Sequence, residues 1–278
     1  MRVIDFSVPL NEIEIVPCAD WHIGSPQCDV NLIKEMCEYI AKTPNCYTIL
    51  NGDLVDNNIV NAVGSVFEAT MSPLEQVVRA AYYLQDVAKQ GKIINMTSGN
   101  HEQRTAKGVA LSPSDLLLAK LMAYDETLNE RYCEDGAFTF LTMNGRKSNE
   151  HKSKIVFTIF NLHGSGSGSK IGGKIQRLDD MSNIVSANLY IRSHTHQPET
   201  HRGVIMAVNT NFHTVKEESC VYVNTGSALL YGGYGARAGM KPLSRGIPVI
   251  TLRVLRKNHK REELYIKEID CTIKERLL

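Results

Sequence analysis

Five short segments of this chain carry carboxylate, imidazole and amide side chains of the kind that bind divalent cations. In chain order the candidate ligands are Asp20, His22, Asp53, Asn100, His163, His194 and His196. This mixture of donors suits manganese, iron or zinc better than magnesium or calcium alone. A pair of such ions needs an anionic ligand that bridges them and terminal ligands on rigid elements. The set therefore predicts a site for two divalent metal ions.

The candidates divide into two shells around a single bridging carboxylate, for which Asp53 is the expected residue. The first expected shell consists of Asp20, His22 and His196. The second consists of Asn100, His163 and His194. Alternate residues of an extended chain point to the same side, so the pairs 20/22 and 194/196 are each expected to serve one site.

A pair of ions held in this way has a defined chemistry. It holds water as hydroxide, with a pKa lowered from about 15.7 to roughly 7, and aims it in line at a phosphorus atom. The leaving oxygen then needs a proton, and His101 lies beside the ligand Asn100 without being needed for coordination. Asp56 is expected to fix the tautomer of His101, and Glu102 to orient a neighbouring group. General acid catalysis of this kind contributes roughly 10² to 10⁴ in rate.

The first hundred residues predict the elements that would position these side chains. Residues 12–19, 46–51 and 92–97 read as strands, and residues 30–42 have apolar side chains at helical spacing. Ser72 and Pro73 open a second helix that runs to Lys89. Ligands gather at the carboxyl ends of parallel strands, and Asp20, Asp53 and Asn100 all follow such ends. A pocket is expected there.

The remainder of the chain predicts a second sheet. Helices are expected over residues 112–124 and 171–187, and strands over 137–143, 154–162 and 188–192. Short strands then dominate, at 204–208, 220–224, 248–255 and 263–273. The simplest architecture has two facing layers of strands with helices outside. We expect residues 1–278 to form one domain.

Composition narrows the class of protein. The 278 residues carry a net charge of +1, so no global field attracts nucleic acid or a membrane surface. Seven cysteines without regular spacing predict a reduced, cytoplasmic protein. No apolar run approaches the roughly 20 residues that cross a bilayer, which predicts no membrane association. Homodimerisation stays open, because the glycine-rich loop at 230–246 can serve either as a subunit contact or as a substrate loop.

Basic residues in two loops are candidates for binding a substrate phosphate. Arg104 and Lys107 follow the expected acid His101, and Arg237, Lys241 and Arg245 lie in the glycine-rich loop. Glycine-rich backbone lets cations approach phosphate closely, although glycine can equally shape a long loop. Both readings stay open.

The ligand segments resemble the calcineurin-like metallophosphoesterases, whose pattern is D-x-H, G-D-x-x-D, G-N-H-[DE], a lone His and G-H-T-H. Ser193 replaces the glycine before the last His-x-His, and Thr225 stands where a related N-P-G-S segment has proline. The resemblance implies an α/β fold, a four-layer αββα sandwich of two mixed β-sheets flanked by helices. It also implies a dinuclear site, Asp53 as bridge, His101 as proton donor and phosphoester hydrolysis.

The candidate ligands indicate the class of reaction more directly than they indicate the substrate. The first hypothesis is a phosphodiesterase or nuclease acting on DNA or other nucleic acid, because the ligand order resembles that of double-strand-break repair nucleases and no large cap domain covers the pocket. A small-molecule phosphodiesterase or a phosphomonoesterase such as a nucleotide phosphatase is the alternative. A non-catalytic interaction module is disfavoured because the ligands and His101 are all present. Two Mn²⁺ ions are the expected cofactors, with iron or zinc as alternatives.

Overall fold

The computed structural model describes residues 1–59, 66–105, 111–144, 154–166, 170–210, 213–239, 241–242, 244–259 and 262–278. The strands are β1 (Arg2–Val8), β2 (Glu12–Ile15), β3 (Cys46–Asn51), β4 (Ile93–Thr97), β5 (Tyr132–Cys133), β6 (Ala137–Asn144), β7 (Lys154–Leu162), β8 (Leu189–Arg192), β9 (Glu199–Asn209), β10 (Thr214–Asn224), β11 (Ile247–His259) and β12 (Glu262–Lys274). The α-helices are α1 (Val30–Lys42), α2 (Pro73–Lys89), α4 (Pro113–Leu121), α5 (Ile171–Asp179) and α6 (Gly233–Arg237). Short 3₁₀ helices are η1 (Val66–Glu68), η2 (Glu126–Arg131) and η3 (Asp180–Asn183).

Six strands form the β3 sheet, in the order β12-β11-β2-β3-β4-β5. Strands β2, β3, β4 and β5 run parallel, as the strand and helix alternation of the first hundred residues predicts. Their carboxyl ends therefore meet at one edge. β11 and β12 add an antiparallel hairpin on the side of β2.

Six other strands form the β7 sheet, in the order β1-β6-β7-β8-β10-β9. β7, β8 and β10 run parallel, so the carboxyl ends of β7 and β8 also lie together. β1 pairs in parallel with β6, and β9 pairs antiparallel with β10. The sequence analysis did not predict β1, whose partner strand lies far along the chain.

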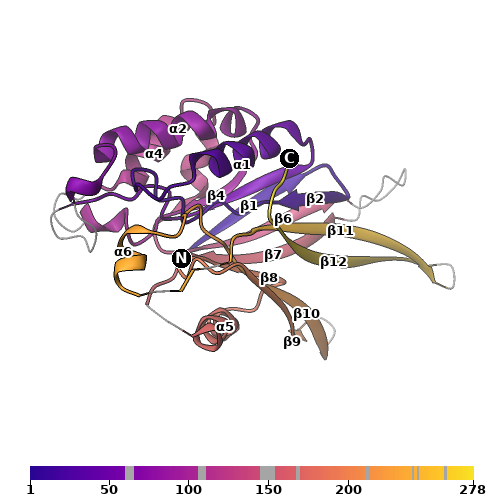
Figure 1. Cartoon of the computed structure of the whole chain (residues 1–278). Helices are drawn as coiled ribbons and strands as arrows, with labels where there is room; N and C mark the ends of the chain where they lie inside the picture. Colours follow the sequence, from indigo (N-terminus) through magenta and orange to yellow (C-terminus); the bar gives the residue numbers. More distant parts are fainter. Residues whose placement is uncertain are drawn as a thin grey trace.

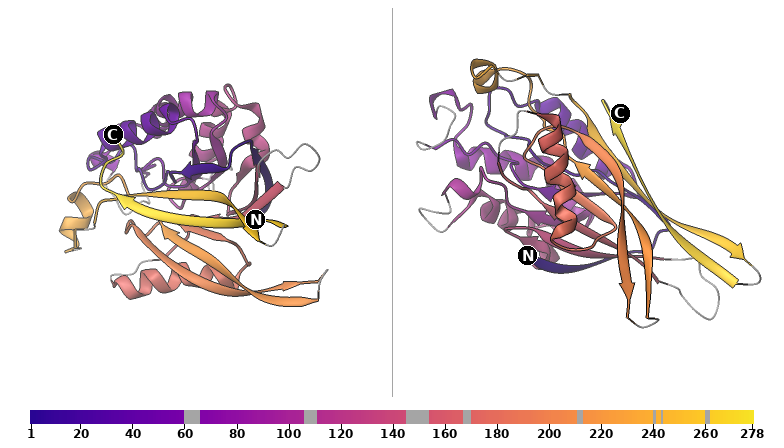
Figure 2. Two further views of the ribbon diagram at one scale, coloured as in Figure 1. Left: turned by 90° about the vertical axis from the view of Figure 1, so that its right-hand side faces the viewer. Right: turned by 90° about the horizontal axis from the view of Figure 1, so that it is seen from below.

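The two sheets face each other with helices outside, which confirms the predicted four-layer α/β sandwich (Figure 1). Helices α1, α2 and α4 pack on the outer face of the β3 sheet around buried residues such as Ile33 and Leu84. The layer between the sheets is largely apolar and includes Ile49, Phe157 and Ile191. α5 and η3 cover the outer face of the β7 sheet (Figure 2).

Local sequence explains most helix boundaries. The side chain of Asp29 accepts a hydrogen bond from the backbone N–H of Leu32 and caps α1. Ser72 and Glu75 form a reciprocal capping box at the start of α2, with Pro73 in the first turn. The helix predicted over residues 171–187 is shorter, because α5 ends at Asp179 and continues as the 3₁₀ turn η3. The hydroxyl of Ser182 donates to the carbonyl of Asp179, which competes with continued helix.

The hairpins β9/β10 and β11/β12 extend away from the end of the sandwich where β3 and β8 finish (Figures 1 and 2). The loops that follow the parallel strands lie at the end where β3 and β8 finish, away from the tips of the two hairpins, and carry the candidate ligands. None of the helices in the described part of the chain combines the length and apolar composition that a bilayer-spanning segment requires.

Candidate metal centre

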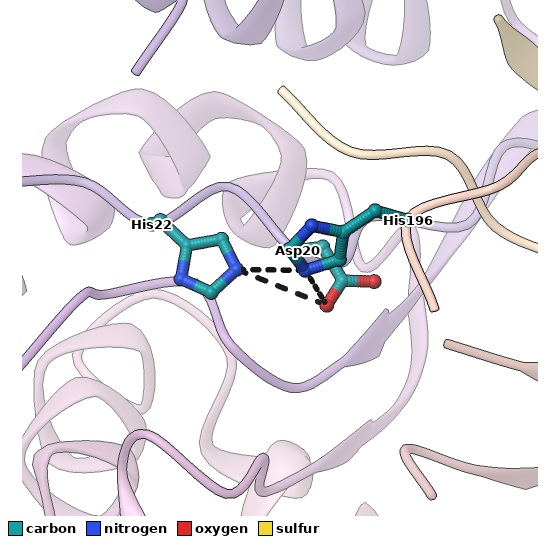
Figure 3. Close-up of side chains that lie close together, drawn as sticks. All are labelled: Asp20, His22 and His196. Atoms are coloured by element: carbon teal, nitrogen blue, oxygen red, sulfur yellow. Dashed lines mark hydrogen bonds and ion pairs between the residues drawn. The ribbon is translucent and has the colours of Figure 1, made fainter. Parts of the chain in front are cut away.

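The first three predicted ligands come together from two different sheets. The Nε2 atoms of His22 and His196 lie 3.1 Å apart, and both approach Asp20 Oδ1, at 4.0 and 3.3 Å. Figure 3 shows the three side chains turned toward a common point. Asp20 and His22 follow β2, whereas His196 follows β8, so the group spans the two facing sheets. These ligand atoms are close enough to hold one metal ion.

A second group forms beside the first. Nε2 of His163 lies 3.1 Å from Asp53 Oδ2 and 3.1 Å from Asn100 Oδ1, and Nδ1 of His194 lies 2.7 Å from the same Asn100 oxygen. Asp53, His163 and His194 again offer ligand atoms within reach of one ion. His163 Nε2 is also 4.0 Å from Asp20 Oδ1, which makes the two groups neighbours. All seven predicted ligands therefore belong to one cluster.

The backbone at these residues differs from the expectation that the pairs 20/22 and 194/196 are extended. Asp20, His22, Asp53, His194 and His196 have φ angles of 51°, 49°, 52°, 72° and 57°, in the left-handed region. This conformation costs a non-glycine residue about 1–2 kcal/mol. The twist at residues 194 to 196 sends His194 to the second group and His196 to the first. Such strain is held by surrounding structure and is typical of functional sites.

Two glycines permit the strand ends to approach closely. A Cβ on Gly52, whose φ is 81°, would lie 2.6 Å from the backbone of Gly99, and a Cβ on Gly99 would lie 2.1 Å from Asp53 Oδ1.

The adjoining Glu102 carboxylate is buried and accepts four backbone N–H bonds. These come from Asp53, Leu54, Val55 and Gly99, at 2.9, 2.7, 3.2 and 3.0 Å. Glu102 thus orients the Asp53 loop, as the sequence predicted.

The predicted acid His101 lies at the rim of the cluster. Its Nδ1 is 2.8 Å from the carbonyl of Asp56 and 3.2 Å from the Asp56 carboxylate, which also faces His22 Nδ1 at 3.4 Å. Its Nε2 is 3.8 Å from Asp53 Oδ2. Arg104 Nη2 lies 2.8 Å from the same Nε2. Because a guanidinium only donates, Nε2 accepts this bond and the proton sits on Nδ1.

The cluster keeps its buried carboxylates ionised. Burial by itself would raise the pKa values of Asp20 and Asp53, but facing imidazoles outweigh it. His196 has the largest opposing influence on Asp20, and His163 on Asp53, so both pKa values lie below their usual range. Asp20 and Asp53 are 0% and 1% exposed. Two such charges out of water favour a cation between them.

The imidazoles divide into two electrostatic classes. Burial disfavours a proton on His163, but the charge and hydrogen bond of Asp53, with Asp20, raise its pKa to about 10. Burial, followed by the charge of His163, lowers the pKa of His194 to about 4. Burial also lowers the pKa of His22. His22 and His194 are thus neutral at pH 7, as ligation requires, whereas His163 holds a proton that a metal ion would displace.

The donor set fits divalent metal ions. Asp20 Oδ1 is buried and has no hydrogen-bond partner among the described residues. The other oxygen, Oδ2, accepts bonds from His194 N and the Thr225 hydroxyl, at 3.0 and 3.3 Å. Oδ1 therefore faces the His22 and His196 nitrogens without a donor of its own, which is the position of a metal ligand.

The predicted substrate cations are distributed differently. Arg104 contacts His101 and the Asp56 carbonyl, at 2.8 and 3.1 Å, and so lies at the metal centre. Arg237 pairs with Glu68 at 3.0 Å, and Arg245 pairs with Asp29. Lys241 is exposed, and Lys107 lies outside the described residues. Carboxylates thus already neutralise two of the predicted cations.

Sequence reasoning did not single out Asn51, the last residue of β3. Its carbonyl lies 2.8 Å from His163 Nδ1, so it orients a proposed ligand. Its side chain donates to the hydroxyl of Ser193, at 2.7 Å. Ser193 and Thr225 are the two departures from the family pattern. The Thr225 hydroxyl donates to the Asp20 carboxylate, and the Ser193 hydroxyl accepts from Asn51. A polar residue closing an otherwise apolar strand before Gly52 was the available signal.

The model of the calcineurin-like phosphoesterase family matches residues 13–204, more than half of the chain. The chain belongs to the calcineurin-like phosphoesterase family. The match includes all seven predicted ligands as well as Asp56 and His101. Members of this family bind divalent metals, in agreement with the two side-chain groups described above.

No curated protein matches the chain. Among solved structures, it is similar to vacuolar protein sorting 29 from Cryptosporidium parvum, with 12% identity over 94% of this chain and 99% of that one, at a TM-score of 0.39. It is also similar to an uncharacterised predicted phosphoesterase from Streptococcus pneumoniae TIGR4, with 11% identity, 95% and 99% coverage and a TM-score of 0.37. A third is Vps29 with Zn²⁺ from Entamoeba histolytica, with 9% identity, 94% and 99% coverage and a TM-score of 0.35.

Proposed function

We propose that this calcineurin-like phosphoesterase is a hydrolase that uses two divalent metal ions, with Mn²⁺ as the first candidate, to cleave phosphoesters. The observation that carries the proposal is the convergence of seven donor side chains from both sheets into two adjoining groups. Asp20, His22 and His196 would hold one ion, and Asn100, His163 and His194 the other. Asp53 would bridge them. When bound, such ions polarise phosphoryl oxygens and activate water for attack on phosphorus.

The chain's own residues supply the proton for the leaving oxygen. The Asp56 carbonyl and carboxylate hold His101 Nδ1, which turns Nε2 toward the Asp53 side of the cluster. Burial opposes a proton on this imidazole, but Asp56 and then Asp53 raise its pKa. His101 Nε2 would therefore carry the proton to the leaving oxygen, while Asp56 keeps the ring oriented.

Arg104 controls whether Nε2 of His101 can hold this proton. Its guanidinium donates a hydrogen bond to Nε2 of His101, and a nitrogen that accepts such a bond cannot carry a proton at the same time. A substrate phosphate offers Arg104 a stronger, charge-assisted acceptor than a neutral imidazole. We infer that substrate draws Arg104 away from His101, so that Nε2 can take up a proton from solvent and then give it to the leaving oxygen. Arg104 then binds a non-bridging phosphate oxygen.

For the substrate, we propose a phosphodiester of nucleic acid. His196 is 24% exposed and His101 18%, so the cluster opens toward solvent at the side where Arg104 lies. Arg104 lies beside this opening, where it can bind a phosphate of a nucleic-acid backbone. The near-neutral net charge predicts modest affinity, with a salt dependence set by local contacts rather than by a global field.

A small phosphoester is the second candidate, and the paired arginines favour it. Arg237 and Arg245 are held by Glu68 and Asp29, which leaves fewer cations for a long phosphate backbone. A monoester or nucleotide needs only the metal pair and one additional cation such as Arg104.

The experiment compares the purified protein, loaded with Mn²⁺, on bis-(p-nitrophenyl) phosphate, p-nitrophenyl phosphate and single- and double-stranded DNA. Hydrolysis of any of these, lost on chelation and restored by Mn²⁺, supports the hydrolase proposal. A fall of DNA cleavage with rising salt, beside salt-insensitive turnover of the small esters, supports the nucleic-acid substrate. If the protein binds metal but cleaves none of them, the catalytic proposal is wrong. If it cleaves only small esters, the second candidate stands.

A further inference from the structure

Asn51 uses the full hydrogen-bonding capacity of a buried amide. It is 0% exposed. Its Nδ2 donates to the carbonyl of Leu162 at 3.0 Å and to Ser193 Oγ at 2.7 Å. Its Oδ1 accepts from Asn161 Nδ2 at 3.0 Å and from Thr97 Oγ1 at 2.9 Å. An amide has two donor hydrogens and two acceptor lone pairs, so no capacity remains.

The orientation of this amide follows from its partners. The carbonyl of Leu162 only accepts, so the atom facing it is the Asn51 nitrogen. The amide oxygen must then face Asn161 and Thr97. Asn161 is in turn fixed, because its own oxygen accepts from Asn95 Nδ2 at 2.9 Å. The Asn51 amide is therefore fully satisfied in a single orientation, and a satisfied buried amide specifies one geometry.

Each partner of Asn51 stands shortly before a proposed ligand in the chain. Asn51 itself lies two positions before Asp53, and Thr97 ends the strand before the loop of Asn100. Leu162 is followed directly by His163, and Ser193 by His194. The carbonyl of Asn51 also orients His163 through Nδ1, at 2.8 Å. One residue thus connects the ends of β3, β4, β7 and β8.

The two ligand groups differ in this respect. The members of the second group, Asp53, Asn100, His163 and His194, all follow strand ends that Asn51 contacts. In the first group, His196 follows the β8 end beyond Ser193, but Asp20 and His22 follow β2. The Asn51 side chain makes none of its described hydrogen bonds to that segment. Only the Asn51 backbone N–H does, at the carbonyl of Cys18, and substitution of the side chain leaves this bond in place. The effect of removing Asn51 should therefore be unequal between the two groups.

We propose that Asn51 is a positioning residue that holds the second ligand group, Asp53, Asn100, His163 and His194, in its metal-binding geometry, and that Ser193 is its partner across the two sheets. The inference rests on the proposed metal-binding function and names the residues that preset one of its two ion sites. Ser193 stands where the family pattern has glycine. Its hydroxyl links the network to the end of β8, directly before His194. Residues that orient ligands in this way typically change metal affinity by roughly 10–100-fold.

The test measures metal binding directly. Calorimetric titration of the metal-free protein with Mn²⁺ resolves two binding steps, and the visible absorption of bound Co²⁺ reports ligand geometry independently of turnover. The variants are Asn51→Ala, Ser193→Ala, their combination and Ser193→Gly, which restores the family residue. Asn188→Ala is the matched control. Asn188 is 6% exposed and its Oδ1 accepts from Thr158 N at 3.1 Å, so it also links β7 to the start of β8, at the end away from the metal centre.

We expect Asn51→Ala and Ser193→Ala to weaken one of the two Mn²⁺ sites by roughly 10–100-fold and to alter the Co²⁺ spectrum. The other site depends on these strand ends only through the bridging Asp53 and through His196, so its affinity should fall by a smaller factor. Adding Ser193→Ala to Asn51→Ala should have little further effect, since the bond between them is already lost. Asn188→Ala should lower the urea midpoint without changing Mn²⁺ affinity. Ser193→Gly and Ser193→Ala are the mild variants that carry the test should Asn51→Ala not fold.

Three results would overturn the proposal. One is Mn²⁺ affinity in the Ser193 variants equal to that of the wild type. The second is an equal loss at both sites, which would mean general loosening. The third is an Asn188→Ala variant that loses the same affinity. A wild-type protein that binds no metal would overturn the proposed function as well, whereas a wild type that binds two ions alongside unaffected variants would overturn this inference alone.

Discussion

Replacing Glu102 by Gln tests how the loop of Asp53 is held. One oxygen of Glu102 accepts from Asp53 N and Gly99 N, and the other from Leu54 N and Val55 N. A glutamine has only one oxygen, so in either orientation two buried N–H groups face its NH₂ group. An unsatisfied buried donor costs about 1–3 kcal/mol. We therefore expect a loss of about 2–6 kcal/mol in the free energy of unfolding.

The assay is urea unfolding of the metal-free protein. Burial, and then the charge of Asp53, raise the pKa of Glu102 to about 7, so the measurement is made near pH 8.5, where the carboxylate is ionised.

Glu35→Gln is the matched control. Glu35 is 7% exposed and also accepts two backbone N–H bonds, from Leu277 and Leu278, but both go to one oxygen, which glutamine retains. Its remaining interaction is an ion pair with the exposed Arg276, so the control should lose about 1 kcal/mol or less. A Glu102→Gln variant within about 0.5 kcal/mol of the wild type, or no less stable than the control, would refute the reasoning.

Three further predictions follow from the same contacts. His101→Ala should keep both metal ions bound and reduce kcat by roughly 10²–10⁴, measured by calorimetry and ester turnover; unchanged kcat would remove His101 from the mechanism. Lys92→Met should lower the free energy of unfolding by about 3 kcal/mol in urea, because the buried Nζ donates to three carbonyls at the end of α1, at 2.8, 3.0 and 2.8 Å. Folding raises the pKa of His163 from 6.5 to about 10, so its stabilisation is present below pH 6.5 and is lost as pH rises through about 10. The metal-free protein should therefore lose stability across that range, and a flat profile would contradict the assignment.

The sequence predicted the elements whose signals are local. The bounds of α1, β3 and β7 agree with the predicted ranges 30–42, 46–51 and 154–162, because hydrophobic periodicity, caps and turn residues mark them. The convergence of the ligand segments was also predictable, since parallel strands bring their carboxyl ends to one edge. These two regularities predicted the two-sheet sandwich and placed the ligand segments at one edge of it.

Features that depend on distant partners were not predictable in the same way. Arg237 and Arg245 pair with residues 169 and 216 positions away, so their loop composition alone did not reveal their partners. The Asn51 network joins residues up to 142 positions apart. Asp20 and His194 have left-handed backbone although neither is glycine, the residue that usually marks this conformation in a sequence.

The central claim is that seven side chains form one centre for two cations. The direct measurement is anomalous scattering from crystals soaked in Mn²⁺. We expect two peaks about 3.5–4 Å apart, one against Asp20, His22 and His196 and the other against Asn100, His163 and His194, with Asp53 contacting both. A single peak, or peaks away from these residues under saturating metal, would contradict the account.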